Sequence, residues 1–581
     1  MKDTWVVDWQ RDERLPYYTR ANAGEVLADP ASPLGWSLVF EKGLLPGWFR
    51  GFVEFGIYAQ DEMGPPKYPV VGIFGGYFYL NLSHMRLLGL RLGAELEKFD
   101  LELLGAHPDT PPYEPREGDI NPELTAKAMA TIGEILGSTS FPLIEEDRRR
   151  TSRFRAERPD LTALSDAELV ARARFFIPEL DNAFARHDYS SLASTLGPTM
   201  LAGLCASVDR PDLHLSLISG LGDVESASPA TGLWTLSRAA NASAEITALF
   251  DSGPEAVLAA VQNPATPAQR DYAALVDAFM REYAFRGPNE WDIHSLSWEA
   301  DPVQPLRLVN GIRRASDADS PQARHEAMAQ RREQAADTMR ALLADNAEAL
   351  GTFEMAFASA RMAVPSRELT KATSVATINE VRMAIRELGR RGVAAGLYAA
   401  PEDVMMLMDD ELDAYVADPA SMAPLIAERL EQYTELFELD PPFIIASDPP
   451  PLSQWKRRAS RRVTPLAAGD VLAGLGGGAG RYTGRVCVLH DPSDMAKLEA
   501  GDVLVAPFTD AAWTPLFLIA GAVVVDVGAL NSHAVVVSRE LGIPSVLSVT
   551  TGTTQLVDGM EVTVDGTAGT VTVVSTAGTT V

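Results

Sequence analysis

The chain has 581 residues, which is too long for one hydrophobic core and predicts two or more domains. Apolar residues make up 46% and charged residues 22% of it, an ordinary globular composition that excludes a largely disordered protein. The 50 Lys and Arg against 79 Asp and Glu leave a net charge of −29. We therefore expect neither nucleic acid nor an anionic membrane as a partner.

The cysteines and the chain start indicate the compartment. Cys205 and Cys487 are far apart, which excludes a disulfide scaffold and a cysteine-based zinc site and suits a reducing environment. Met1–Trp5 leads at once into charged residues and shows no signal-peptide pattern. The most apolar run, Leu516–Val525, is too short to span a bilayer and predicts a buried strand. A cytoplasmic protein is expected.

Residues 1–447 are predicted to form a large, mostly helical domain. The exception is Tyr68–Leu82, whose β-branched and aromatic residues surround a Gly-Gly pair and predict a small β-hairpin. Further along, Pro321–Arg361 and Ile378–Leu397 carry apolar residues at three- and four-residue spacing. This spacing predicts two long helices.

The composition changes near residue 448. Asp448–Pro451 contains three consecutive prolines and precedes the basic run Lys456–Arg462, so we predict a linker over 448–464. A stiff arm that carries a moving domain and a plain interdomain spacer both stay open. From Pro465 onward, short Val-rich strands alternate with glycine turns, which predicts a compact β/α domain over 465–581. The expected fold class is multidomain α+β.

The clearest chemical signal lies between Asp526 and Pro544. A buried strand and a glycine turn precede His533, which begins a helix that is expected to end at Gly542. Asn531 and Ser532 are both suitable N-cap residues. A helix N-terminus can bind a phosphate group, and a neutral imidazole there can attack a phosphoryl group. For a lone histidine at a helix start, capping or packing is the alternative.

This segment resembles the phosphohistidine swivelling domain of the PEP-utilising enzymes, which include phosphoenolpyruvate synthase and rifampin phosphotransferase. The residues that carry the resemblance are Val503–Thr514, Ser532-His533-Ala534, Arg539–Pro544 and the strand turn Asp565–Gly569. The resemblance implies that His533 is the phosphorylated residue and that Ser532 supports it.

Three other segments resemble the substrate-binding domain of rifampin phosphotransferase. They are Asn22–Leu27, Tyr283–Pro302 and Arg367–Lys371. By resemblance, Arg286 and Glu290 in the second segment are candidate supporting residues. The third segment implies that its two cations, Arg367 and Lys371, face the phosphohistidine and bind its phosphate.

The cation pair also has a physical argument of its own. Pro365-Ser366 predicts a helix start, which would place Arg367 in a first turn, where a cation opposes the helix dipole. Lys371 would lie one turn later on the same face, and like charges at that spacing repel. A shared anion would remove both conflicts. Two solvated surface charges are the alternative.

The histidines other than His533 show no metal-ligand spacing, so we expect them to be structural. They are His84, His107, His187, His214, His294, His325 and His490. The sequence does not assign ligands for a metal ion in this chain.

The resemblance also implies how His533 is charged. Family members use an ATP-grasp domain or a PEP-binding barrel, and we recognise neither in this sequence. A separate ATP-grasp subunit is therefore the expected partner, as for the α-type subunit of phenylphosphate synthase. ATP and Mg²⁺ are implied through that partner, and this chain alone is not expected to bind the nucleotide tightly.

The expected activity is that of a dikinase-type phosphotransferase subunit. It would pass the phosphoryl group from His533 to the hydroxyl of an apolar small-molecule acceptor. We expect the acceptor pocket in the helical domain, lined in part by segments rich in Met and aromatic residues. These segments are Tyr77–Met85, Met355–Met362 and Met405–Met408. A phosphocarrier or regulatory binding module and an inactive partner-binding homologue are the alternatives.

Overall fold

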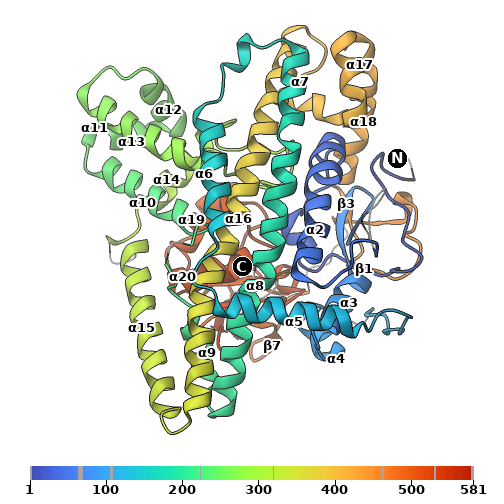
Figure 1. Ribbon diagram of the computed structural model, residues 1–581. Coiled ribbons are helices and arrows are strands. Elements are labelled where there is room, and N and C mark those ends of the chain that lie inside the picture. Colours follow the sequence, from blue (N-terminus) through green and yellow to red (C-terminus); the bar gives the residue numbers. More distant parts are fainter. Residues whose placement is uncertain are drawn as a thin grey trace. The chain divides into compact units, whose positions relative to one another are not determined.

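A computed structural model of the chain describes residues 3–62, 68, 70–104, 107, 109–222, 224–317, 320–458, 464–528 and 532–576. Long helices and several sheets alternate along these residues, which confirms a multidomain α+β protein (Figure 1). In the described part of the chain, no helix is both long and apolar enough to cross a membrane.

The chain forms two compact units, each built from separate stretches of sequence. Unit 1 comprises Met1–Ser194, Asn289–Ser295 and Leu369–Arg461. Unit 2 comprises Thr195–Pro288, Leu296–Glu368 and Arg462–Val581. Two long helices, α8 (Ile177–Ser207) and α16 (Ala347–Ala394), contribute residues to both units. The boundaries at 447 and 465 that the sequence suggests stay predictions.

Unit 1 combines helices with a small antiparallel sheet of strand order β2-β3-β1-β5. Its strands are β1 (Tyr18–Thr19), β2 (Val71–Phe74), β3 (Tyr77–Asn81) and β5 (Ile444–Ile445). Its helices include α1 (Ala23–Val26), α2 (Leu45–Phe55), α3 (Leu82–Arg91), α4 (Leu96–Leu104), α5 (Pro122–Gly137), α6 (Pro142–Ala156), α7 (Asp166–Phe175), α17 (Leu412–Ala417) and α18 (Pro419–Leu436). A π-helical segment, Gly35–Leu44, precedes α2.

The predicted hairpin is confirmed as β2 and β3. Its turn uses Gly75 and Gly76 at φ values of 59° and 77°, a left-handed conformation that glycine adopts without strain. Four residues of β2 and five of β3 are all buried. The hairpin is therefore part of the unit 1 core.

The first part of the predicted linker is folded. Leu452 and Trp455 are buried, and β6 (Lys456–Arg457) pairs with β4 (Leu439–Asp440). The strand pairing and the buried side chains hold the chain against unit 1 up to Arg458. Residues 459–463, which include most of the basic run, lie outside the described residues.

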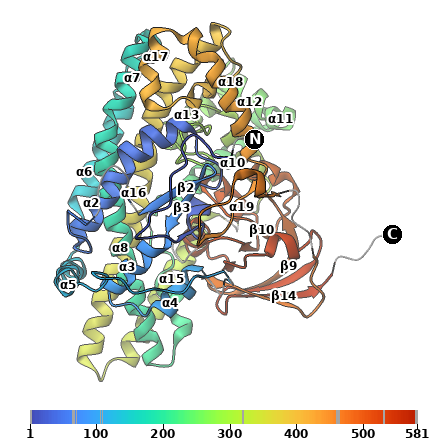
Figure 2. The same ribbon diagram turned by 90° about the vertical axis from the view of Figure 1, so that its right-hand side faces the viewer.

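Unit 2 contains an eight-stranded mixed sheet of order β7-β14-β13-β9-β10-β11-β12-β8, part of which is visible in Figure 2. Its strands are β7 (Val471–Ala473), β8 (Leu475–Gly478), β9 (Arg481–Val488), β10 (Val503–Ala506), β11 (Ala522–Val525), β12 (Ser545–Leu547), β13 (Glu561–Asp565) and β14 (Thr570–Ser575). Strands β9 to β12 run parallel to one another. The β/α character predicted for this region is confirmed.

The helices of unit 2 cover this sheet and build the neighbouring helical layer. They include α9 (His214–Leu217), α10 (Ser228–Asn241), α11 (Ala244–Ser252), α12 (Pro254–Gln262), α13 (Pro267–Tyr283), α14 (Val303–Ile312), α15 (Pro321–Leu342), α19 (Thr514–Phe517), α20 (His533–Leu541) and α21 (Gly552–Gln555). Helix α10 packs on α13 and α14, and α15 packs on α20.

Alternate residues of β10 and β11 serve two different cores. Leu504 and Val523 join a cluster that includes α20 and residues of α10 to α14. Val503 and Val524 belong to a second cluster with β13 and β14. Because both faces of these strands are covered, every residue in them is apolar and buried.

Two helix predictions need correction. The helix predicted over Pro321–Arg361 is broken after Leu342, and α16 then continues through Pro365 to Ala394. Pro365 therefore lies inside a helix and does not begin one. Proline in a helix interior costs about 3 kcal/mol, and the helix-forming residues packed on both sides offset that cost.

Candidate functional site

His533 lies where the predicted helix begins. Helix α20 starts at His533 and ends at Leu541, and Gly542 caps it at φ 64° in the left-handed region. Val535 and Val537 point into the core cluster of unit 2, which fixes the helix against the sheet. The short apolar helix thus places the imidazole at a defined position after β11.

Parallel strand pairing brings the partners of His533 to it. Strands β10 and β11 pair in parallel from Val503↔Ala522 to Ala506↔Val525, so their carboxyl ends lie at one edge of the sheet. Thr509 follows β10, and His533 follows β11. This edge of a parallel sheet is where ligands commonly bind.

Two threonine hydroxyls hold the imidazole ring. Thr509 Oγ1 lies 3.0 Å from Nδ1, and Thr514 Oγ1 lies 3.0 Å from Nε2. The ring of Phe517 stands edge-on to it, with centroids 6.0 Å apart. A neutral imidazole has one donor and one acceptor nitrogen, so one threonine accepts a hydrogen bond and the other donates one. The site residues are buried, and His533 itself is 5% exposed.

Ser532 occupies the N-cap position, but its side chain makes no capping hydrogen bond. Its Oγ is buried and has no hydrogen-bond partner among the described residues. The other predicted cap, Asn531, lies outside those residues. The start of α20 therefore offers a buried hydroxyl and first-turn N–H groups that the Ser532 side chain does not cap, a combination suited to an anion.

Asp526, the residue after β11, fixes the turn that leads to this site. Its carboxylate accepts hydrogen bonds from the backbone N–H of Thr553, at 3.2 Å, and from the Thr553 hydroxyl. The buried carboxylate thus ties the end of β11 to α21.

The cations of the predicted phosphate site are paired with buried carboxylates. Arg367 Nη1 lies 2.5 Å from Oε1 of Glu368, and the Ser226 hydroxyl donates to the other oxygen of Glu368. Lys371 Nζ lies 3.5 Å from Oε1 of Glu290. The side chains of Arg367 and Lys371 are 17% and 16% exposed, so they are not solvated surface charges.

Both cations lie deep inside α16, so the first-turn position predicted for Arg367 is wrong. The helix dipole therefore gives no reason to expect an anion at Arg367. Arg367 and Lys371 still lie four residues apart on one helix, so the argument from the repulsion of like charges stands. Arg286 is 1% exposed, and its carbonyl accepts a hydrogen bond of 2.7 Å from Trp298 N. His533, Arg286 and Arg367 belong to unit 2, and Glu290 and Lys371 belong to unit 1. Their roles in phosphoryl transfer stay predictions.

Two of the three segments predicted to line an acceptor pocket pack largely into cores, whereas Met355 at the start of the remaining segment is 37% exposed. Tyr77, Phe78, Met405 and Met406 are at most 1% exposed, and none of the three segments lines either of the two cavities described for the structure. Apolar and Met-rich composition is shared by cores and ligand pockets, so it could not separate them.

Sequence reasoning did not assign a role to Thr509 or Thr514. Both lie in the stretch that resembles the swivelling domain, but their contacts depend on how β10 and β11 pair. Among the residues that the structure describes, no group of three His, Cys, Asp or Glu side chains is arranged to hold a metal ion.

Comparison with known proteins identifies two regions. Residues 187–368 match the family model of the rifampicin phosphotransferase fourth domain, rifampicin being another name for rifampin. Residues 498–569 match the mobile domain of the PEP-utilising enzymes. The second region holds β10, β11 and the whole of α20, and so includes Thr509, Thr514 and His533.

Individual relatives agree with these matches. A rifampicin phosphotransferase of Bacillus subtilis is 29% identical over 299 residues, which are 50% of this chain and 33% of that protein. The one of Streptomyces sviceus is 28% identical over 303 residues, 52% of this chain and 34% of the relative. An uncharacterised protein of Mycobacterium tuberculosis is 37% identical over 211 residues, 36% of this chain and 23% of the relative.

The matched regions thus account for about a third or less of the length of these relatives. The match to the mobile-domain model, over residues 498–569, includes the segment in which the sequence places the phosphohistidine. The resemblance seen in the sequence is confirmed: residues 187–368 are similar to a domain of the rifampicin phosphotransferases, and residues 498–569 are similar to the mobile domain of the PEP-utilising enzymes.

Proposed function

We propose that this chain is the phosphotransferase subunit of a dikinase-type enzyme, with His533 as the phosphoryl carrier. The observation that carries the proposal is the geometry at the start of α20. The imidazole is held by Thr509 and Thr514 beside the buried hydroxyl of Ser532, which makes no hydrogen bond to a described residue. A nucleophile, its orienting groups and a place for phosphoryl oxygens are thereby combined.

Charging of His533 requires one ring nitrogen to exchange its threonine hydroxyl for phosphorus. The lone pair of that nitrogen forms the N–P bond to the β-phosphorus, and the oxygen that bridges the α- and β-phosphorus atoms leaves on AMP with its electron pair. Water then cleaves the bond to the γ-phosphoryl group, which leaves as phosphate and keeps the β-phosphoryl group on nitrogen. The other threonine stays bonded to the opposite nitrogen and keeps the ring in place. Backbone N–H groups at the helix start and the Ser532 hydroxyl are suited to hold the phosphoryl oxygens.

Discharge reverses these changes at the acceptor. A hydroxyl oxygen of the acceptor attacks phosphorus, the N–P bond breaks, and its electron pair returns to the imidazole. The acceptor's proton can then bind that nitrogen, so His533 also serves as the base. We assign Arg367 and Lys371 to the negative charge on the moving phosphoryl oxygens, because cations in such positions stabilise the transition state.

The phosphoryl source in this proposal is an ATP-grasp partner that converts ATP to AMP and phosphate. Mg²⁺ belongs with the nucleotide on that partner, and we assign no metal ligand in this chain because the described residues provide no cluster suited to one. The acceptor in the proposal is an apolar small molecule with a hydroxyl group.

The test follows labelled phosphate through the reaction. The chain and its nucleotide-binding partner are incubated with ATP labelled in the β-phosphoryl group, and His533→Ala should abolish both labelling and product. Arg367→Ala and Lys371→Ala should become labelled but pass the label on about 100- to 1000-fold more slowly. Arg361→Ala, an exposed arginine on the same helix, is the matched control and should behave as the wild type.

Three results would contradict the proposal. Labelling that survives in His533→Ala would place the phosphoryl group on another residue. Loss of labelling in the Arg367 variant would assign that cation to charging or folding. A wild-type chain that is labelled but transfers nothing to any hydroxyl acceptor would instead be a phosphocarrier.

A further inference from the structure

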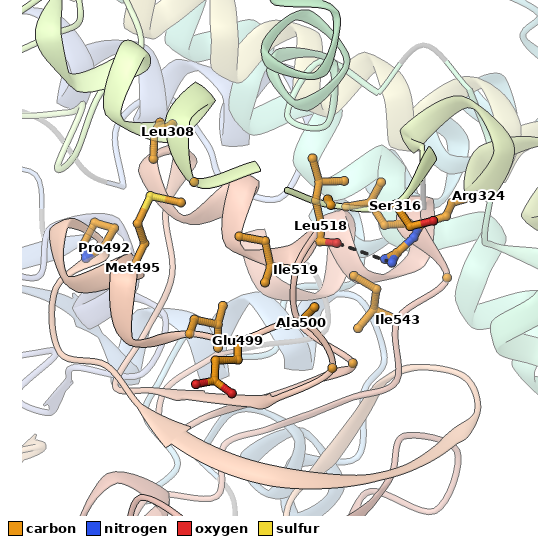
Figure 3. Close-up of a pocket in the computed structure, with 18 of the residues that line it drawn as sticks. Leu308, Ser316, Arg324, Pro492, Met495, Glu499, Ala500, Leu518, Ile519 and Ile543 are labelled. Carbon is orange, nitrogen blue, oxygen red and sulfur yellow. Dashed lines mark hydrogen bonds between the residues drawn. The ribbon is translucent and has the colours of Figure 1, made fainter. Parts of the chain in front are cut away.

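A large cavity lies within unit 2, and His533 is not among the residues that line it. Its volume is about 1700 Å³, and it is lined by α14, by the first half of α15 and by residues of the β/α region (Figure 3). Pockets for small organic ligands commonly measure about 300–1000 Å³, so this one has room for a sizeable molecule. Nothing in the proposed phosphoryl transfer uses it.

The cavity combines an apolar wall with arginines. Leu308, Met495, Ile519 and Ile543 contribute the apolar side chains (Figure 3). The lining arginines are Arg307, Arg314, Arg324, Arg331 and Arg481. The lining carboxylates are Asp491 and Glu499. Positive charge therefore exceeds negative charge around this cavity, whereas the whole chain carries −29.

Several of these arginines have no counter-charge. Arg307 pairs with Glu255 at 3.0 Å, and Arg324 donates to the carbonyl oxygens of Phe517 and Leu518 at 3.5 Å. Three others, Arg314, Arg331 and Arg481, are exposed to solvent and form no hydrogen bond or ion pair through their side chains with any residue that the structure describes. Uncompensated guanidinium groups around a partly apolar cavity favour an anion as the occupant.

We propose that this cavity binds an organic phosphate, with its apolar body against the Leu308 and Ile519 side of the wall and its phosphate on the arginines. Guanidinium groups match the oxygen geometry of phosphate and of carboxylate alike. A phosphate monoester carries about −1.5 to −2 charge at pH 7, so it compensates several arginines better than a carboxylate does. The proposal concerns binding alone and is independent of the phosphoryl transfer proposed above.

The wall of the cavity continues into the phosphohistidine site. Ala512 and Leu518 line the cavity, while Thr514 and Phe517 of the same short segment contact the imidazole of His533. A ligand bound at this part of the wall would therefore lie beside the segment that holds the ring.

Binding can be measured with a matched pair of fluorescent probes on the full chain. The anionic probe is 8-anilinonaphthalene-1-sulfonate, and the neutral one is N-phenyl-1-naphthylamine, which lacks the sulfonate. Changing Arg314, Arg331 and Arg481 together to Gln should lower the affinity for the anionic probe by about tenfold or more, because charge-assisted hydrogen bonds are lost. The affinity for the neutral probe should stay the same.

Arg270→Gln is the control variant, since Arg270 is an exposed arginine of unit 2 outside the cavity. It should leave both affinities unchanged. An unchanged affinity of the triple variant for the anionic probe would overturn the proposal. Equal loss of both probes would also overturn it, because the arginines would then maintain the cavity and not bind an anion.

Competition against the anionic probe tests the phosphate assignment. We expect 2-naphthyl phosphate to displace it at lower concentration than 2-naphthoate, and inorganic phosphate, which has no apolar body, to displace it least. If 2-naphthoate displaced the probe at lower concentration than 2-naphthyl phosphate, the ligand would be a carboxylate, and the assignment of an organic phosphate would be wrong. Equal displacement by inorganic phosphate would overturn the role of the apolar wall.

Discussion

Two buried histidines stand near the starts of helices in the two units, and their surroundings differ. His84 is the third residue of α3 and is 1% exposed; His533 is the first residue of α20 and is 5% exposed. Around His84, the Asn81 side chain caps the helix by accepting a 2.9 Å hydrogen bond from the His84 N–H. At α20 the corresponding cap, Ser532, makes no such bond.

The partners of the two rings differ as well. The hydroxyl of Tyr58 lies 2.8 Å from Nδ1 of His84, and the rings of Phe52 and Tyr58 pack against the imidazole at 4.9 and 5.2 Å. Burial lowers the pKa of His84 to about 3, so this ring stays neutral. His533 has threonine hydroxyls on both nitrogens, and these can rotate and change between donor and acceptor.

The comparison shows that burial alone does not distinguish His84 from His533, the residue that we propose as the phosphoryl carrier. The distinguishing features are a first turn that the Ser532 side chain leaves uncapped and hydroxyl partners that can be exchanged for a ligand. His84 has a satisfied cap and an aromatic enclosure, as expected of a packing residue. His533 has the features of an anion site.

The largest expected difference between the two histidines is that substitution of His533 removes activity, whereas substitution of His84 lowers stability. His533→Gln should abolish phosphate labelling while changing the free energy of unfolding by less than about 1 kcal/mol, because Gln keeps a polar group near the threonines. His84→Ala should leave labelling intact but lower stability by about 2–4 kcal/mol, through a cavity and a lost Tyr58 hydrogen bond. Denaturant titration and labelling of both variants are the measurements, and similar effects of the two substitutions would remove the distinction.

The pH dependence of stability should sharpen this contrast. The folded-state pKa of His84 is about 3 against an unfolded value of about 6.5, so its stabilising contribution is complete above pH 6.5 and is lost as the pH falls toward 3. The slope in that window is about 1.4 kcal/mol per pH unit for one group. Unfolding of the wild type and of His84→Gln should be compared at each pH between 7 and 4.

Subtracting the stability of His84→Gln from that of the wild type at each pH isolates the contribution of His84 from those of the other titrating groups. Asp8, whose pKa burial raises to about 6, acts in the opposite direction in the same unit, because its contribution grows as the pH falls from 6. Burial also lowers the pKa of His214 in unit 2 to about 4. Both groups are present in the two proteins and cancel. Parallel pH curves for wild type and variant would refute the assignment.

Local patterns in the sequence predicted the parts of this site that depend on neighbouring residues. The bounds of β10 and α20 follow from a short Val-rich run and from Gly542 as a C-terminal cap, and the Gly75-Gly76 turn predicts the hairpin. These features are decided within a few residues by backbone conformation, so a single sequence contains them.

Features that depend on distant contacts were missed or predicted wrongly. Pro365 signals a helix start locally, yet packing along the 48 residues of α16 carries the helix through it. The bonds from Thr509 and Thr514 to His533 require the parallel pairing of β10 with β11, which no local pattern specifies. The arrangement of Thr509 and Thr514 around His533 therefore depends on tertiary structure.

A smaller effect should tell the two threonines apart. Thr509→Val and Thr514→Val keep side-chain volume but remove the hydroxyl from Nδ1 and Nε2, respectively. The threonine on the non-reacting nitrogen orients the ring, so its loss should slow labelling by about tenfold. The hydroxyl on the reacting nitrogen leaves before phosphorus bonds there, so its loss should change the rate by less than about threefold.

Labelling rates and the ¹⁵N shifts of the imidazole would identify the nucleophilic nitrogen. Thr483→Val is the control, because Thr483 pairs with Thr563 in the same sheet and is not a hydrogen-bond partner assigned to His533. Equal slowing by the two threonine variants would mean that both hydroxyls only position the ring.

The smallest expected effect concerns Ser532, whose hydroxyl is buried without a partner among the described residues. Removing it in Ser532→Ala should change the free energy of unfolding by no more than about 0.5 kcal/mol, because no hydrogen bond to a described residue is lost. If the hydroxyl instead binds a phosphoryl oxygen, the phosphorylated form loses about 1 kcal/mol, and its phosphate should be lost about fivefold faster. Ser538 on the same helix is the matched control, since its Oγ is also buried and has no hydrogen-bond partner within the described chain. Ser538→Ala should match Ser532→Ala in denaturation yet keep the wild-type phosphohistidine half-life, and equal half-lives for both variants would show that Ser532 does not contact the phosphoryl group.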